Sequence, residues 1–180
     1  LINNKIEFSE LCRKLFNKKV KRILLINPPD VDKNLFNYSS ANRGRNMNYP
    51  PYGLGLISSQ LEKINIDNKI LNLNHTILKA AQHNFSEAEF DFKKIQFEHI
   101  KNEIDKFKPD FVAITCMFSQ THQSLLDVIQ HIKELTVSPI SIGGVHVTGS
   151  MNDEGVKQKF LKDIKGVDFI FLNESEISFR

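Results

Sequence analysis

The residues with the clearest chemical meaning are Gly143, Gly144 and His146, which directly follow a short apolar run that begins at Pro139. A buried parallel strand that ends in two glycines is typical of a ligand-binding turn. Glycine reaches positive φ and has no Cβ, so a ligand can approach its backbone closely. We therefore expect ligand contact at the two glycines. His146 has two interpretations, a direct ligand contact or a polar group satisfied within the protein.

Polar residues also follow two other apolar runs. Thr115 and Ser119 come at the end of the run over residues 111–115, where they could hydrogen-bond a ligand or cap the next helix. Glu174 follows the run over residues 167–172, where its carboxylate could bond ligand hydroxyls or face water. Cys116 is expected to be a small buried hydrophobic residue.

Several common site motifs do not occur in the sequence. No Gly-x-Gly-x-x-Gly follows the first apolar run, and neither Gly-x-x-x-x-Gly-Lys-Ser/Thr nor Gly-x-Ser-x-Gly is found. The two cysteines, Cys12 and Cys116, lie far apart and form no Cys-x-x-Cys pair. A standard dinucleotide site, a P-loop, a nucleophile elbow and a cysteine metal site are therefore not expected.

The elements that would position these residues alternate along the chain. Strand candidates occupy residues 23–26, 69–73, 111–115, 139–142 and 167–172, and the continuous apolar run over residues 23–26 is typical of a strand buried on both faces. Apolar residues at helical spacing occupy residues 54–64, 97–107, 121–135 and 156–164. This alternation predicts an α/β fold, a five-stranded doubly wound parallel sheet of the flavodoxin-like or Rossmann-like type with helices on both faces.

The remaining segments are less regular. Residues 5–18 have the pattern of an amphipathic helix, and we expect an N-terminal helical extension over residues 1–20 followed by one domain over residues 21–180. The polar segment over residues 31–52 is long enough to be a functional lid or a disordered loop. Residues 74–92 are expected to be irregular, with at most a short helix around residues 77–81.

Composition and charge argue against a nucleic-acid-binding, membrane-spanning or secreted protein. The net charge of +3 is too small to indicate nucleic-acid binding, and no apolar run approaches the ~18 residues of a membrane span. The first twenty residues are polar and charged, without the pattern of a secretory signal. Together with the two distant cysteines, this favours a cytoplasmic protein with neither nucleic acid nor membrane as a partner.

Five stretches, in order, resemble the N-terminal cobalamin-binding domains of cobalamin-dependent radical S-adenosylmethionine enzymes. Asn27-Pro28-Pro29 is similar to the Asn-Pro-Pro that ends their first strand. The other four stretches are residues 49–62 (Pro-Pro-x-Gly-Leu), residues 108–115 (Pro-Asp and a hydrophobic strand), Gly143-Gly144-Val145-His146 (Gly-Gly-x-His) and residues 167–176 (Val-Asp, then Gly-Glu-Gly-Glu).

The resemblance implies that the chain binds cobalamin at the carboxyl edge of its sheet. The nucleotide tail would lie along the loops carrying Thr115, Ser119, Gly143 and Gly144, and the corrin would be covered by residues 28–53 and a further domain. The binding residues that it implies are Asn27, Pro28, Pro29, Tyr52, Gly53, Thr115, Met117, Ser119, Gly143, Gly144, Val145, His146, Asn173 and Glu174. On this basis Gly144→Val is expected to block the tail and leave the domain folded.

The chain departs from related patterns in three ways. Residues 30–35 contain no histidine where other cobalamin domains carry a cobalt ligand, so histidine ligation is not expected. Asn173 and Ser175 replace the two glycines of Gly-Glu-Gly-Glu. No Cys-x-x-x-Cys-x-x-Cys is present to hold an iron–sulfur cluster. We therefore expect no catalytic residues and no metal ligands here, with the cluster, S-adenosylmethionine and the radical or methyl-transfer chemistry in a downstream partner domain after Arg180.

Two alternatives remain open. The same fold could lack cobalamin and act as a structural or docking domain. It could also be a flavodoxin-like regulatory module that binds another small molecule.

Overall fold

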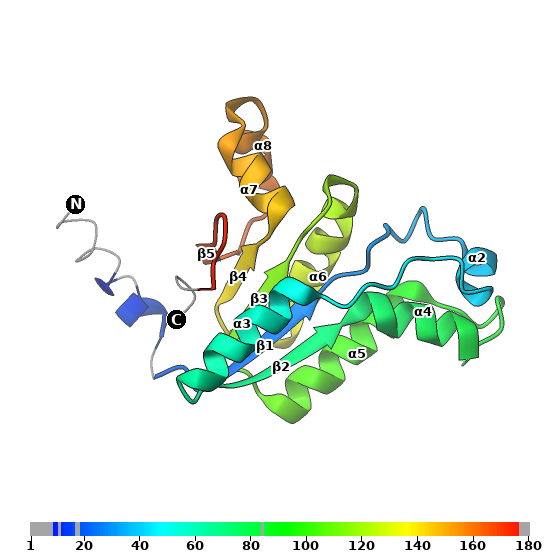
Figure 1. Ribbon diagram of the computed structural model, residues 1–180, viewed down its shortest axis with the longest axis horizontal. Helices are drawn as coiled ribbons and strands as arrows, with labels where there is room; N and C mark the ends of the chain where they lie inside the picture. Colours follow the sequence, from blue (N-terminus) through cyan, green and yellow to red (C-terminus); the bar gives the residue numbers. More distant parts are fainter. Residues whose placement is uncertain (1–8, 11, 17–18, 84, 177–180) are drawn as a thin grey trace.

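The computed structural model describes residues 9–10, 12–16, 19–83 and 85–176. Strands and helices alternate through this part of the chain (Figure 1). In order they are β1 (Arg22–Asn27), α2 (Tyr38–Asn42), α3 (Tyr52–Lys63), β2 (Asp67–Asn72), α4 (Leu73–His83), α5 (Phe92–Phe107), β3 (Phe111–Thr115), the 3-10 turn η1 (Ser119–Thr121), α6 (His122–Leu135), β4 (Ile140–Gly143), α7 (Val145–Asn152), α8 (Glu154–Asp163) and β5 (Phe169–Ile170).

The five strands form one parallel sheet in the order β2-β1-β3-β4-β5. This is the flavodoxin-like order of a doubly wound sheet, so the predicted fold class is confirmed. Because all strands run in the same direction, the loops that follow them meet at one carboxyl edge. In Figure 1, α7 and α8 continue upward from the end of β4.

The two faces of the sheet are covered differently. One face, which includes Leu24 and Ile114, packs against apolar residues of α5, α6, α7 and α8. The opposite face, which includes Leu25 and Ala113, packs against Leu54 and Leu61 of α3. Within the described residues, α3 is the main cover of that second face, together with Phe16, whose ring lies 5.6 Å from Phe111.

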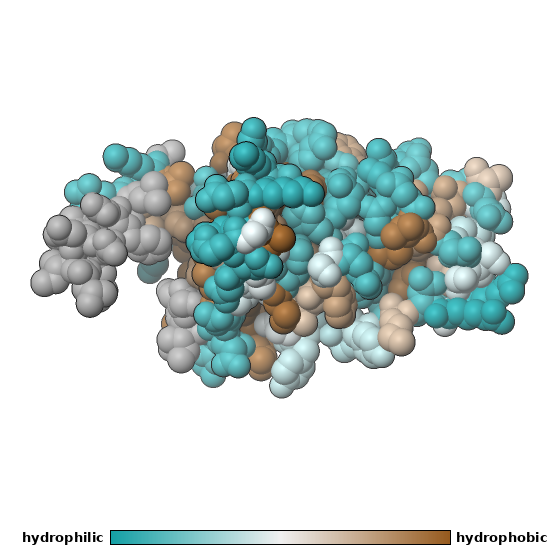
Figure 2. Space-filling model, turned by 90° about the horizontal axis from the view of Figure 1, so that it is seen from above, coloured by the Kyte–Doolittle hydropathy of each residue, from teal (hydrophilic) through white to brown (hydrophobic). Residues whose placement is uncertain are grey.

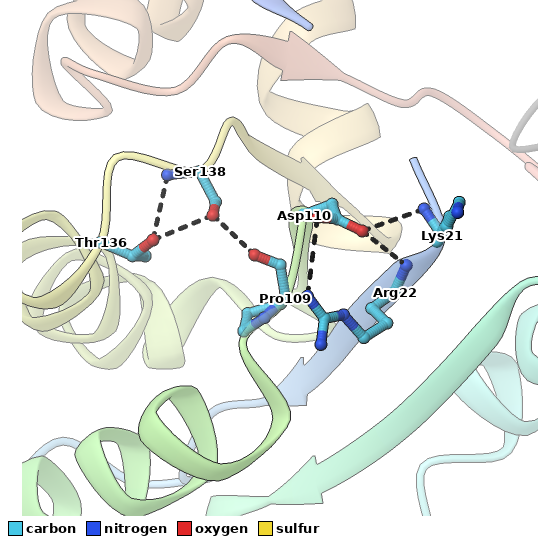
Figure 3. A network of polar contacts seen from close by, with 6 residues as sticks. All are labelled: Lys21, Arg22, Pro109, Asp110, Thr136 and Ser138. Carbon is cyan, nitrogen blue, oxygen red and sulfur yellow. Dashed lines mark hydrogen bonds and ion pairs between the residues drawn. The ribbon is translucent and has the colours of Figure 1, made fainter. Parts of the chain in front are cut away.

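Carboxylates fix the strands at the opposite, amino edge (Figure 3). The Oδ2 atom of Asp110, just before β3, accepts hydrogen bonds from the backbone N–H groups of Lys21 and Arg22, both at 3.0 Å. Asp168, just before β5, likewise accepts from the N–H of Ile140 at 2.8 Å. Each aspartate therefore satisfies a donor at the start of a neighbouring strand, which explains why a Pro-Asp and a Val-Asp precede these strands.

Two helices extend beyond what the sequence predicts. Residues 74–92 were expected to be irregular with at most a short helix around residues 77–81, whereas Leu73–His83 forms α4. Its buried residues Leu73, Ile77 and Ala81 recur every four positions, which is a helical spacing. Residues 145–152, for which no helix was predicted, form α7.

Several other elements begin or end at different residues in the structure than the sequence predicts. Leu73, predicted to end the second strand, begins α4, and β5 is two residues long rather than the predicted six. The polar segment over residues 31–52 contains the short helix α2, which packs Ala41 beside α4 (Figure 1). The predicted N-terminal helix lies partly outside the described residues, although residues 9–10 and 12–15 are helical. The proposed boundary at residue 20 stays a prediction.

Within the described residues, no helix is long and apolar enough to cross a membrane.

Asp110→Ala is expected to lower the free energy of unfolding by about 1.5–3 kcal/mol, because it leaves the part-buried N–H of Arg22 and the exposed N–H of Lys21 without their charged acceptor. Urea denaturation of the wild type and the variant measures the change. Asp105→Ala is the control, since Asp105 is exposed and forms a surface ion pair with Lys101; it should change stability by less than about 0.5 kcal/mol. Equal effects of the two substitutions would contradict the structural role of Asp110.

Candidate functional site

A cavity of about 740 Å³ opens at the carboxyl edge, on the face of the sheet covered by α3. Its floor is formed by residues of β3 and β4, one wall by α3, and the other by the start of α7 and the segment after β5. The residues lining it are Gly53, Leu54, Ile57, Ala113, Ile114, Thr115, Met117, Ser141, Ile142, Gly143, Gly144, Val145, Thr148, Gly149, Phe171, Asn173, Glu174, Ser175 and Glu176.

Small residues on adjacent strands create the hollow. Ala113 pairs with Ser141 and Thr115 pairs with Gly143 in the register of β3 and β4. By contrast, β1 presents Ile23 and Leu25 on the same face, and α3 fills the space above them. α3 packs over β1 and β2, so the sheet is covered there and hollow above β3 and β4, where the short residues Ala113, Ser141 and Gly143 fill little space.

Position 144 requires glycine because the backbone of Cys116 lies against it, and not because a ligand needs open space there. Its φ is +108°, and a Cβ added to it would lie 2.5 Å from the carbonyl oxygen of Cys116. The N–H of Cys116 donates to the oxygen of Gly143 at 2.8 Å, and the N–H of His146 donates to the oxygen of Cys116 at 3.1 Å. The expectation that Gly144→Val would leave the domain folded is therefore wrong, because the added side chain meets backbone atoms.

Cys116 itself is buried, as expected from the sequence. Burial raises the pKa of its thiol, and its Sγ lies 3.5 Å from the Oγ1 of Thr121. The side chain thus serves as part of the core while its backbone holds the turn at Gly144.

His146 turns away from the cavity. Its Nε2 lies 3.1 Å from Nδ1 of His122, and its ring contacts the ring of Phe160 edge-on at 5.7 Å. Burial, and then the neighbouring His122, lower the pKa of His146. His146 and Ser119 line a separate neighbouring cavity. This geometry agrees with the interpretation of His146 as a polar group satisfied within the protein.

The predicted residues at the end of β1 also lie outside the cavity. Asn27, Pro28 and Pro29 are buried, and Nδ2 of Asn27 donates to Oδ1 of Asn72 at 3.1 Å. Asn27 thereby joins the ends of β1 and β2, and the two prolines that follow it are buried outside the cavity.

Asn74, at the start of α4, ties two loops to this edge. Its Oδ1 accepts from the N–H of Asp30 at 3.1 Å, and its Nδ2 donates to the carbonyl of Met47 at 3.2 Å. The segment over residues 31–52 is therefore anchored to the sheet at Met47. Burial raises the pKa of the Asp30 carboxyl in the first of these loops.

The structure gathers eight of the fourteen predicted residues around the cavity, and their role there stays a prediction. These eight are Gly53, Thr115, Met117, Gly143, Gly144, Val145, Asn173 and Glu174. Tyr52 is 76% exposed beside Gly53 and does not line the cavity.

Sequence reasoning missed most of the apolar lining and several polar lining residues, among them Ser141. Leu54 and Ile57 were assigned to a helix face without regard to the site, and Phe171 to a strand. A signal was present in β4, where Ser141 interrupts an otherwise apolar run. Thr148, also missed, accepts a hydrogen bond from the N–H of Asn173 at 2.9 Å and so holds the loop after β5.

The family model described as the B12 binding domain matches residues 45–179. The chain belongs to the B12-binding domain family. The resemblance inferred from the sequence is thereby confirmed, and the matched range contains every residue that lines the cavity. No curated protein matches the chain.

Solved structures of larger proteins contain a similar fold. One is TsrM from Kitasatospora setae, a radical S-adenosylmethionine methyltransferase, with tryptophan substrate and a SAM analogue bound. Its TM-score is 0.50 at 17% identity, over 78% of this chain and 22% of that chain. TsrM with cobalamin and a [4Fe-4S] cluster bound gives a TM-score of 0.49 at 17% identity, over 79% of this chain and 21% of that chain. The B12-binding chain thus spans about a fifth of the length of TsrM, and the similarity concerns the fold.

Gly144→Ala is expected to destabilise this B12-binding domain by at least ~2 kcal/mol, because it combines positive-φ strain with overlap on the Cys116 carbonyl. Gly55→Ala is the control: Gly55 lies within α3 and has no atom within 4 Å of an added Cβ, so alanine should be neutral or stabilise by about 0.5–1 kcal/mol. Thermal and urea denaturation measure both. A fully stable Gly144→Ala variant would show that the turn at Gly144 is not constrained.

Proposed function

We propose that this chain binds cobalamin, with the nucleotide tail in the cavity and the corrin ring above the carboxyl edge. The observation that supports this most strongly is the cavity itself. It opens at the carboxyl edge of a doubly wound sheet, where ligands of such sheets bind, and it lies inside the range matched by the B12-binding family.

The lining of the cavity suits the tail. A volume of about 740 Å³ is in the range of small-molecule pockets, so it suits a nucleotide with the larger corrin left outside. Gly53 on α3 and Gly149 on α7 face open space, since no atom lies within 4 Å of a Cβ added to either. The floor of Ala113, Ser141 and Gly143 leaves room for a flat ring beneath α3.

Exposed apolar side chains near the mouth of the cavity support the position of the corrin. Val145 is 65% exposed and Met117 is 48% exposed, and both line the cavity. Phe118 and Tyr52 are further exposed apolar residues next to lining residues. On the face seen from above, hydrophobic residues appear as separate patches among hydrophilic ones (Figure 2). Contact of a large ring with such side chains removes apolar surface from water.

Bound cobalamin supplies a cobalt centre that can accept and donate a methyl group. The residues of this chain would hold and orient that group. Gly53, Leu54 and Ile57 would contact one side of the tail, and the floor of β3 and β4 the other. Thr115, Gly143, Gly144, Asn173 and Glu174 would line its entrance, as the sequence predicts.

We also propose that the chain forms the cobalamin-binding part of a radical S-adenosylmethionine enzyme. The motif order along the chain and the fold shared with TsrM support this. In such an enzyme the iron–sulfur cluster and S-adenosylmethionine would be held by a downstream domain, which would be the chain's partner and would cover the corrin.

Gly53→Leu is the sharpest test of cobalamin binding, because the leucine side chain would occupy the cavity. Hydroxocobalamin is titrated into the purified chain, with absorbance spectra and co-elution in gel filtration as readouts. We expect wild-type binding, and at least tenfold weaker binding by Gly53→Leu. Gly55→Leu is the control, since Gly55 lies on the same helix in open space, outside the cavity, and should bind as the wild type does.

The outcomes separate the alternatives. No retention of hydroxocobalamin by the wild type would favour a docking domain with the same fold. Equal binding by Gly53→Leu and the wild type would establish corrinoid binding and remove the cavity from the site.

A further inference from the structure

Ser141 is a buried polar residue with no structural partner. It is 1% exposed, and its Oγ has no hydrogen-bond partner in the described part of the chain. Among the residues lining the cavity, it is the one with a buried side-chain oxygen left unpaired. Buried hydroxyls without partners are uncommon because each costs free energy, so this one requires a reason.

The position of Ser141 supplies that reason. On β4 it lies two residues before Gly143, which places it about 7 Å deeper in the cavity than the carboxyl edge. Its side chain is on the same face as Ala113, the neighbouring floor residue in the β3–β4 register. A flat ligand group that enters at the carboxyl edge of the sheet, beside α3 and over the floor, would bring its innermost atoms toward the Ser141 hydroxyl.

Apolar side chains surround the floor position next to Ser141. Ala113 pairs with Ser141 in the β3–β4 register, and Ile57 of α3 and Phe171 after β5 pack against the cluster that contains Ala113. A hydroxyl in apolar surroundings favours a ligand edge that can donate or accept a hydrogen bond. It disfavours a methylated edge, which would leave the hydroxyl unpaired after binding.

We propose that Ser141 selects the base of the corrinoid tail, favouring bases with a polar edge, such as a purine, over dimethylbenzimidazole. This proposal rests on the proposed function, because it assumes that the cavity takes the tail. It assigns to Ser141 a role in ligand discrimination, distinct from the glycines and apolar residues that shape the cavity.

Three probes test the proposal by equilibrium titration of the 180-residue chain: the adenine-tailed cobamide, cobalamin, and cobinamide, which has no nucleotide tail. The wild type should bind the adenine-tailed cobamide more tightly than cobalamin, and cobinamide most weakly. Ser141→Ala should bind the adenine-tailed cobamide about 5–10-fold more weakly, with its affinity for cobalamin unchanged or higher.

Two controls keep the result interpretable. Ser141→Ala should unfold at the same or a higher urea concentration than the wild type, because it removes an unpaired buried hydroxyl. Ser59→Ala, on the exposed side of α3 and outside the cavity, should leave all three affinities unchanged.

Each failure has a separate meaning. If none of the three corrinoids binds, the proposed function and the role of Ser141 both fall. If cobinamide binds as tightly as the tailed probes, corrinoid binding stands but the cavity does not take the tail, and the proposal is wrong. If the tailed probes bind and Ser141→Ala leaves their affinity ratio unchanged, Ser141 does not select the base.

Discussion

The backbone contact between Gly144 and Cys116 is the constraint on which the carboxyl edge depends. The ends of β3 and β4 approach so closely there that a single Cβ would overlap the Cys116 carbonyl. Hydrogen bonds from Cys116 to Gly143 and from His146 to Cys116 lock this approach on both sides. Because the turn is fixed, α7 starts at a defined position. The start of α7 in turn forms one wall of the cavity.

The two edges of the sheet have different roles. At the amino edge, Asp110 satisfies backbone donors at the start of β1 (Figure 3), Asp168 satisfies one at the start of β4, and both so stabilise the strands. At the carboxyl edge, small residues leave space instead. The same division separates the two faces: several helices fill one, whereas α3 covers the other and leaves it hollow over β3 and β4. The hollow proposed to bind a ligand and the aspartates that stabilise the strand starts therefore lie at opposite edges of the sheet.

The sheet was predicted well because strands such as β1, in its stretch from Ile23 to Ile26, and β3 are apolar runs with sharp breaks. The sequence pattern predicted only the centre of α4, because Leu73 was assigned to the preceding strand although Leu73, Ile77 and Ala81 share one helix face. It missed α7, whose composition of glycine, valine and serine has little helical periodicity. These helices depend on packing against the sheet, which spacing along the chain does not encode.

The candidate site was predicted only in part for a similar reason. Motif residues such as Gly53 and Gly143 gather at the cavity, whereas His146 and Asn27 form contacts within the protein. Adjacent motif positions can point to opposite sides of a turn, so a motif does not say which of its side chains meet a ligand. Ser141 was overlooked because a serine inside a strand acquires meaning only once its lack of a partner is known.

A crystal structure of the chain with hydroxocobalamin would test the central claim most directly. Electron density for the tail base between α3 and the floor formed by Ala113 and Ser141, with the corrin beside Val145 and Met117, is the expected result. A cobalamin bound elsewhere, or one whose tail base lies in solvent while the cavity stays empty, would contradict it.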